Sequence, residues 1–177
     1  MSETLNKAAI AVTIILLIVL VNSLGDAETF RCTIAQGQTV NVRNRPSTKA
    51  ATHGKRLYSG SEITGSACEG GKWIQYEDDE GEACYVSSKY AEMVITEKVT
   101  VIGNGRLKWR KTPGGKAGGY YHPGDTLIVW GIAFDKDGGM WARTAESRWA
   151  LGGRFISLDY LATEDGKTLS EIYGITD

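Results

Sequence analysis

The side chains with the widest chemical range in this sequence are three cysteines and two histidines: Cys32, Cys68, Cys84, His53 and His122. A cysteine beside a histidine can act as a nucleophile, and the two residue types together are preferred zinc ligands. Their spacing favours neither chemistry, because the chain has no CxxC pair, both histidines stand far from the cysteines, and His122 precedes a proline in a predicted turn. No nucleophile elbow, HExxH or phosphate-binding loop is present. We therefore expect a non-catalytic protein with no metal and no cofactor.

Disulfide formation is the remaining role for the cysteines. Three cysteines allow three single pairings, and we favour Cys68 with Cys84, which closes a short loop across predicted neighbouring strands. Such a loop would contribute roughly 3 kcal/mol to a small domain. Cys32 would then be left unpaired. Disulfides belong to proteins outside the cytosol, so this pairing goes with export.

The N-terminal segment, residues 1–27, is the clearest targeting signal. It contains an uncharged run of 17 residues, Ala8 to Leu24, preceded by Lys7. That length lies between the core of a signal peptide and a membrane span. Both interpretations stay open: a cleaved secretory signal, or a retained anchor crossing the membrane through residues 8–24. Either one places the rest of the chain outside the cytosol.

Net charge excludes one class of partner and separates two parts of the chain. The formal net charge is −1, which does not suggest a nucleic-acid binder. Residues 96–163 hold 10 basic and 6 acidic residues, and residues 164–177 form a polar, acidic tail. The excess of positive charge suits an anionic partner or docking of that tail. The acidic turn at residues 77–82 does not have the spacing of a calcium loop and is better explained as a solvated hairpin tip.

Two stretches of the chain repeat each other. Residues 40–46 and 107–113 each alternate apolar and polar residues, reach a basic residue, and end at a proline. Downstream, the Gly-Gly-x-Trp stretch at 70–73 is echoed at 138–141, and residues 85–90 by 150–155. Nearly constant offsets indicate a tandem repeat.

The repeated parts predict short strands joined by tight turns. Period-two alternation indicates strands at 29–34, 40–43, 62–68, 73–77, 82–86 and 93–95, then at 99–102, 107–110, 126–132, 141–144 and 148–151. Long polar loops are expected at 44–59 and 113–119, and one helical turn at 87–90 and again in the tail at 168–173. This layout predicts an all-β fold of two small antiparallel barrels, at 28–95 and 96–163, after an N-terminal apolar helix.

The order of these motifs resembles the bacterial SH3 (SH3b) domain. The first repeat matches at residues 40–43, Pro46, Gly60, Trp73 and residues 84–90, whereas the second is diverged, with Trp109 in the place of Val42 and 151–153 in the place of 86–88. The resemblance implies two SH3-like barrels in tandem. It also implies binding of cell-wall peptidoglycan, and the pair of Cys68 and Cys84 resembles a disulfide found in a subset of that family.

The candidate ligand contacts are rim aromatics and outward-pointing polar residues. Tryptophans that open a strand after a turn can stack on sugar or peptide, or can pack in the core. Basic residues on the outward face can bind carboxylates or simply remain solvated. The candidates are Asn41, Arg43, Arg45, Trp73, Tyr76, Tyr85, Lys108, Arg110 and Trp141.

The sequence therefore predicts an exported, non-catalytic binding protein that recognises peptidoglycan or another wall-associated ligand. Two linked modules would raise avidity for a polymer. The alternative is a membrane-anchored adaptor that binds an envelope or secretion-system protein. A regulatory subunit of a separate hydrolase is a third possibility.

Overall fold

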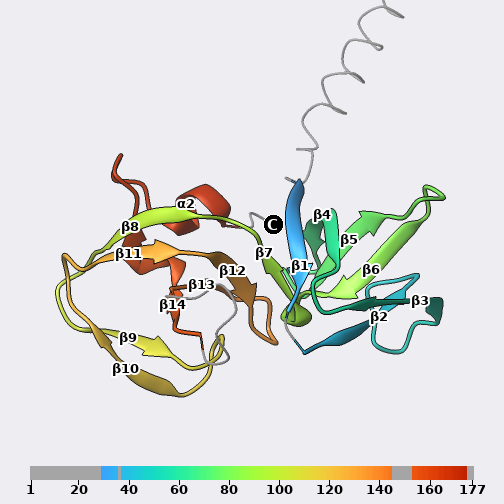
Figure 1. The fold of residues 1–177 in the computed structure, drawn as a ribbon, viewed down its shortest axis with the longest axis horizontal. Helices are drawn as coiled ribbons and strands as arrows, with labels where there is room; N and C mark the ends of the chain where they lie inside the picture. The colour runs from blue at the N-terminus through green and yellow to red at the C-terminus, as the bar shows by residue number, and fades with distance from the viewer. Residues whose placement is uncertain (1–28, 36, 145–152, 175–177) are drawn as a thin grey trace, which may run out of the picture.

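A computed structural model describes residues 29–35, 37–144 and 153–174, which are predominantly β-structure (Figure 1). The all-β prediction is confirmed. The strands form one 12-stranded and one three-stranded antiparallel sheet, and in these ranges no closed barrel is found. The predicted apolar helix within residues 1–27 lies outside the described residues. No helix among the described residues is long and apolar enough to cross a membrane.

The first half of the fold runs from β1 to β7. A single 3-10 turn, η1, precedes the last strand. The elements are β1 (Thr29–Ile34), β2 (Thr39–Arg43), β3 (Thr52–Tyr58), β4 (Glu62–Cys68), β5 (Trp73–Glu77), β6 (Ala83–Ser87), η1 (Ser88–Tyr90) and β7 (Ala91–Met93).

The second half has the same succession and ends in a short helix. Its elements are β8 (Glu97–Val101), β9 (Leu107–Arg110), β10 (Ala117–Tyr121), β11 (Thr126–Val129), β12 (Gly131–Phe134), β13 (Met140–Arg143), β14 (Phe155–Ser157), η2 (Leu158–Tyr160), β15 (Leu161–Ala162) and α2 (Leu169–Tyr173).

Strand pairing repeats between the two halves. In the first, β1 pairs with β4 and β7, β2 with β3 and β6, and β5 with β4 and β6. In the second, β8 pairs with β11 and β15, β9 with β10 and β14, and β13 with β12 and β14. Strand β4 thus corresponds to β11 and β12 together. Trp73 lies opposite Ser87 and Trp141 opposite Ser157, so these tryptophans are equivalent.

Two sequence expectations differ from the structure, and a third falls outside the residues that it describes. The predicted long loops contain edge strands β3 and β10, whose mostly exposed residues lack the alternation that marks a half-buried strand. The echo of 85–90 by 150–155 would place a helical turn near Phe155, whereas Phe155 belongs to β14 and the equivalent turn, η2, lies at Leu158–Tyr160. The expected strand at 148–151 lies outside the described residues.

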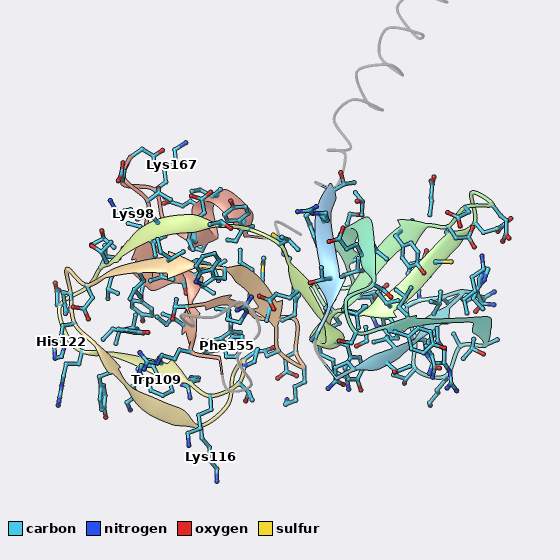
Figure 2. All side chains as sticks on the ribbon, viewed as in Figure 1. Lys98, Trp109, Lys116, His122, Phe155 and Lys167 are labelled. Atoms are coloured by element: carbon cyan, nitrogen blue, oxygen red, sulfur yellow. The ribbon has the colours of Figure 1, made fainter. Side chains whose placement is uncertain are left out.

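In both copies of the alternating stretch, 40–43 and 107–110, the apolar side chains pack against the core, but they are buried to different degrees. Val40 and Val42 of β2 are buried. At the position of Val42, Trp109 of β9 is only half-buried, and its indole lies against Gly118 and Gly119 of β10. A Cβ at Gly118 would overlap the ring, so the neighbouring strand must be glycine there to accept tryptophan. Figure 2 shows Trp109 and, beyond it, Lys116 extending away from the fold.

The two halves share one sheet because β7 pairs with β12 as well as with β1 (Figure 1). Across this joint the Arg143 Nε donates a hydrogen bond to Glu92 Oε1 at 2.5 Å, and the two side chains are 9% and 18% exposed. A Cβ at Gly131 would overlap the Glu92 carboxylate, so glycine leaves room for the pair. Buried side chains of both halves form one continuous cluster.

The acidic tail packs on the second half, as one interpretation of its charge anticipated. Thr168 and Glu171 form a capping box that starts α2, which confirms the predicted helical turn. Leu169 is fully buried. The Tyr173 hydroxyl donates to Glu97, and Lys98 forms an exposed ion pair with Glu164 at 3.1 Å.

The structure of the joint predicts that two ion pairs contribute differently to the free energy of unfolding. Replacing Glu92 with Gln removes the carboxylate that the buried Arg143 guanidinium faces across the joint, and we expect it to lower the free energy of unfolding by about 3 kcal/mol. Glu164→Gln removes only an exposed pair and is expected to leave stability nearly unchanged. Urea unfolding of both full-length variants measures the difference. Equal stability of the two variants would contradict this role of Glu92.

Candidate functional site

An open groove on the second half brings together three of the predicted ligand contacts. Lys108 and Arg110 of β9 and Trp141 of β13 all line it, beside Ser157 and Tyr160. Its volume is about 380 Å³. It begins in the turn between β8 and β9, so the repeated strand forms one wall. Sequence reasoning identified the three residues separately, and the pairing of β9 with β14 and of β14 with β13 brings them to one place.

Trp141 is held on two sides. Its indole Nε1 donates a hydrogen bond to Asp135 Oδ2 at 3.0 Å, and the Arg110 guanidinium lies 5.4 Å from the centre of its ring. Arg110 is fixed in turn, because its Nη1 donates to the Gly115 carbonyl at 2.6 Å. A half-buried indole with a cation over its face is a preorganised surface for stacking and for a carboxylate.

Further residues around the groove were not predicted. Arg106 lines it, and the Arg106 guanidinium lies 4.8 Å from the centre of the Tyr120 ring, which is half exposed. Exposed Tyr160 also lines it. These positions have no counterpart among the motifs, so no sequence pattern points to them. Together with Lys108 and Arg110 they make the groove cationic and aromatic.

A second hollow, also about 380 Å³, shares Trp141 and Ser157 with the groove. Gly70 and Gly138 line it, so both Gly-Gly turns of the repeat meet there. At Gly138, where φ is +92°, the Gly70 carbonyl occupies the position that a Cβ would take. The Gly-Gly pair that repeats in the sequence therefore marks a contact between the two halves.

The corresponding residues of the first half, Asn41, Arg43 and Trp73, line neither of these two hollows. Trp73 is 8% exposed and packs in the core, whereas the equivalent Trp141 is half-buried and lines the groove. Arg43 Nη1 donates to the Ala50 carbonyl at 2.5 Å, just as Arg110 holds Gly115. The repeated arginine thus fastens the loop that follows it. Asn41 and Arg45 are exposed.

Tyr76 and Tyr85 belong to neighbouring strands but do not face the groove. Tyr76 of β5 lies opposite Cys84, and Tyr85 of β6 lies opposite Gln75 and Arg43. Both tyrosines are half-buried. Burial is the main cause of a raised pKa of Tyr76, and the neighbouring Cys84 adds to it, so the phenol is neutral.

The predicted disulfide between Cys68 and Cys84 is wrong. All three cysteines are free thiols. Cys68 is on β4 and Cys84 on β6, with β5 between them, and Cys68 lies opposite Trp73 while Cys84 lies opposite Tyr76. Two strand spacings, about 10 Å, already exceed the roughly 7 Å that a disulfide spans between Cα atoms.

The separation of the histidines from the cysteines along the sequence does not hold in space for His53. His53 of β3 lies beside Cys84 and Asp78, with ligand atoms of the three residues within 4.8 Å of one another. Burial, and then the charge of Asp78, raise the pKa of the Cys84 thiol. A neutral, fully buried thiol is a poor nucleophile, so the cluster does not favour covalent catalysis.

Comparisons with known proteins leave the family open. No protein-family model and no curated protein matches this chain. Among solved structures, NlpC2 from Trichomonas vaginalis is 13% identical with a TM-score of 0.33, covering 78% of this chain and 49% of that one. NlpC1 from the same organism is 15% identical with a TM-score of 0.33, covering 77% and 46%. Ly7917 is 16% identical with a TM-score of 0.30, covering 76% and 61%. The chain spans less than two thirds of each, and scores this low do not establish a common family.

Asp135 provides a pH-dependent test of how Trp141 is held. Burial raises the pKa of this carboxyl, but hydrogen bonds from Trp141 and from the backbone of Asp137 and Gly139 outweigh it and hold the pKa below its usual value. The ionised carboxylate thus stabilises the fold above the ordinary aspartate pKa, and this stabilisation is lost as pH falls through the lowered pKa.

We expect Asp135→Asn to be less stable than the wild type at pH 7, because its amide nitrogen cannot accept from the indole. The gap in unfolding free energy should narrow as the pH falls below about 4. Urea unfolding at several pH values measures it, with Asp137→Asn as control, since Asp137 does not contact the indole. A gap independent of pH would contradict the role of the charge.

Proposed function

We propose that this chain is an exported, non-catalytic binding protein built from two SH3-like modules, and that its second module binds peptidoglycan. The observation that supports this most directly is the groove that joins Trp141 to Lys108 and Arg110. The stem peptides of peptidoglycan carry carboxylates, and its sugars present apolar faces. Cations at a groove wall bind the first, and a fixed indole stacks on the second.

Charge and shape both support an anionic, extended ligand. The groove is open and lies in the half with excess positive charge. The ion pair of Glu164 in the tail involves Lys98, which does not line the groove, so this contact leaves Lys108 and Arg110 to a ligand. A shallow site of this kind suits a repeating polymer, for which weak single contacts are sufficient when several are made.

The two halves have different tasks in this proposal. Because Trp73 is buried, the first module is expected to support the second and not to stack on sugar through this residue. Peptidoglycan binding would therefore depend on Trp141 and not on the tryptophan that matches the family pattern more closely.

Co-sedimentation of the full-length chain with purified, insoluble peptidoglycan tests this function. Lys108→Glu places a negative charge in the groove on an exposed side chain, so folding should be kept while the apparent affinity falls by at least about tenfold. The matched control is Lys116→Glu, an equal change of charge on the same half outside the groove. Equal binding of the two variants, or no binding by wild type, would reject the proposal. No binding to the polymer with retention of an envelope protein would favour the adaptor alternative.

A further inference from the structure

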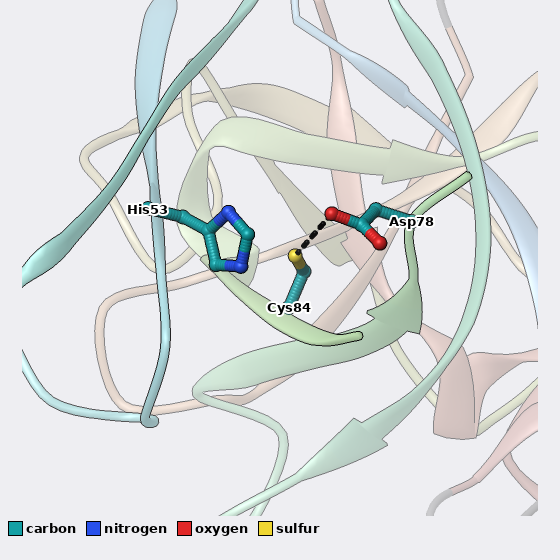
Figure 3. A group of neighbouring side chains, drawn as sticks. All are labelled: His53, Asp78 and Cys84. Carbon is teal, nitrogen blue, oxygen red and sulfur yellow. Dashed lines mark hydrogen bonds between the residues drawn. The ribbon is translucent and has the colours of Figure 1, made fainter. Parts of the chain in front are cut away.

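Three side chains with different ligand atoms converge in the first half, away from the groove. His53 offers an imidazole nitrogen, Asp78 a carboxylate oxygen and Cys84 a thiol sulfur, and these atoms lie within 4.8 Å of one another. Figure 3 shows the three side chains pointing toward a common centre from separate segments of the chain. We propose that they form a binding site for Zn²⁺ or a chemically similar divalent transition metal.

The backbone places His53 there by an irregularity in an edge strand. Between Arg56, opposite Asn41, and Thr52, opposite Arg43, β3 carries three residues against one on β2. Gly54 lies in this bulge with φ of +74°. Bulges redirect side chains at sheet edges, often beside functional sites. Here the bulge brings His53 and Lys55 to the turn between β5 and β6.

Asp78 is oriented by its own turn. Its Oδ1 accepts hydrogen bonds from the backbone N–H groups of Glu80 and Glu82, each at 3.0 Å. Its Oδ2 then faces Cys84, whose thiol donates to it at 3.8 Å. A carboxylate fixed by hydrogen bonds to its second oxygen is the usual support of a metal ligand. The acidic turn, expected to be only a solvated hairpin tip, therefore directs one of its members inward.

The set of ligand atoms and its burial suit zinc better than calcium or magnesium. Sulfur and nitrogen ligands select borderline metals, whereas calcium and magnesium take oxygen. Ionised Asp78 and the Cys84 thiolate together balance a divalent charge, and the thiol proton leaves to solvent when the sulfur binds. Cys84 is fully buried and the Asp78 side chain is 6% exposed, whereas His53 is partly exposed, so the cluster extends from the core toward the surface.

The distances require only a small contraction. Ligand atoms around tetrahedral zinc lie about 3.3–3.8 Å apart, given the usual bond lengths. The separation of Cys84 Sγ and Asp78 Oδ2 already has that value. The imidazole nitrogen lies within 4.8 Å of the other two ligand atoms, so it must approach by no more than about 1.5 Å, which an edge strand with a glycine in its bulge can provide. Three protein ligands leave a fourth position for water.

Lys55 is the competitor that the metal must displace. Its ammonium lies 2.9 Å from Asp78 Oδ2 and 3.1 Å from Glu80 Oε2. When the metal takes Asp78, Glu80 still offers Lys55 a carboxylate. In the metal-free protein the exposed Lys55 ammonium thus neutralises the Asp78 carboxylate. It can move aside when the metal binds, because Glu80 remains its partner.

Cobalt titration of the reduced, full-length, metal-free chain tests the site, because a thiolate bound to Co²⁺ gives an intense near-ultraviolet charge-transfer absorption. We expect this absorption to saturate at one equivalent and to be lost when Zn²⁺ is added. Cys84→Ser should abolish it, and His53→Gln and Asp78→Asn should weaken Co²⁺ binding by at least about tenfold. The chain supplies matched controls: Cys68→Ser and His122→Gln remove the same residue types elsewhere and should bind as the wild type does.

The wild type alone decides the result if a variant does not fold, as circular dichroism would show. Absence of the charge-transfer absorption in the folded wild type overturns the proposal. So does an absorption that persists in Cys84→Ser or that disappears in Cys68→Ser. The metal site is independent of the groove, so peptidoglycan binding and metal binding can fail separately.

Discussion

The hydrogen-bonded joint between β7 and β12 is the constraint on which the rest of this structure depends. Without it the 12-stranded sheet would divide into two smaller sheets, each with one more open edge; with it β7 and β12 cover each other. The joint is built around a buried ion pair, Glu92 with Arg143, and around Gly131, which leaves room for the carboxylate. A buried pair of this kind is costly to break and therefore specifies which surfaces meet. It also fixes the place where the two Gly-Gly turns come together.

Repetition and divergence explain how one architecture carries two different surfaces. Arg43 and Arg110 perform the same structural task, since each fastens the loop that follows its strand. Trp73 and Trp141 occupy equivalent places, yet the first is in the core and the second lines a groove. Trp109 in the place of Val42, with two glycines opposite its ring, is the larger change in the packing of the second half. The first half instead holds the cluster of His53, Asp78 and Cys84, which has no counterpart among the described residues of the second. The two halves thus differ in chemistry while they keep one order of strands.

Much of the fold follows from local pattern, and the failures have physical causes. Alternation predicts strands such as β2 and β9 because their apolar side chains face the core, and the helical turn expected at 168–173 coincides with α2, which a capping box starts. Edge strands β3 and β10 escape prediction because neither face is buried along their length. The disulfide prediction fails because loop length does not reveal that β5 intervenes between Cys68 and Cys84. His53 looks remote in the sequence because a bulge in an edge strand cannot be inferred from spacing. The groove residues Lys108, Arg110 and Trp141 are predictable one by one, but their meeting depends on sheet order.

Hydrogen exchange across the joint tests most directly whether the two halves form one sheet. Mass spectrometry of the full-length chain can compare backbone amides of β7 and β12 with those of edge strands β3 and β10. If the sheet is continuous, amides around Glu92, Met93, Ile132 and Ala133 exchange slowly and together, at rates typical of the core, while edge-strand amides exchange faster. Exchange of β7 and β12 as fast as that of β3 and β10 would show that the joint does not hold in solution, and would contradict a continuous 12-stranded sheet.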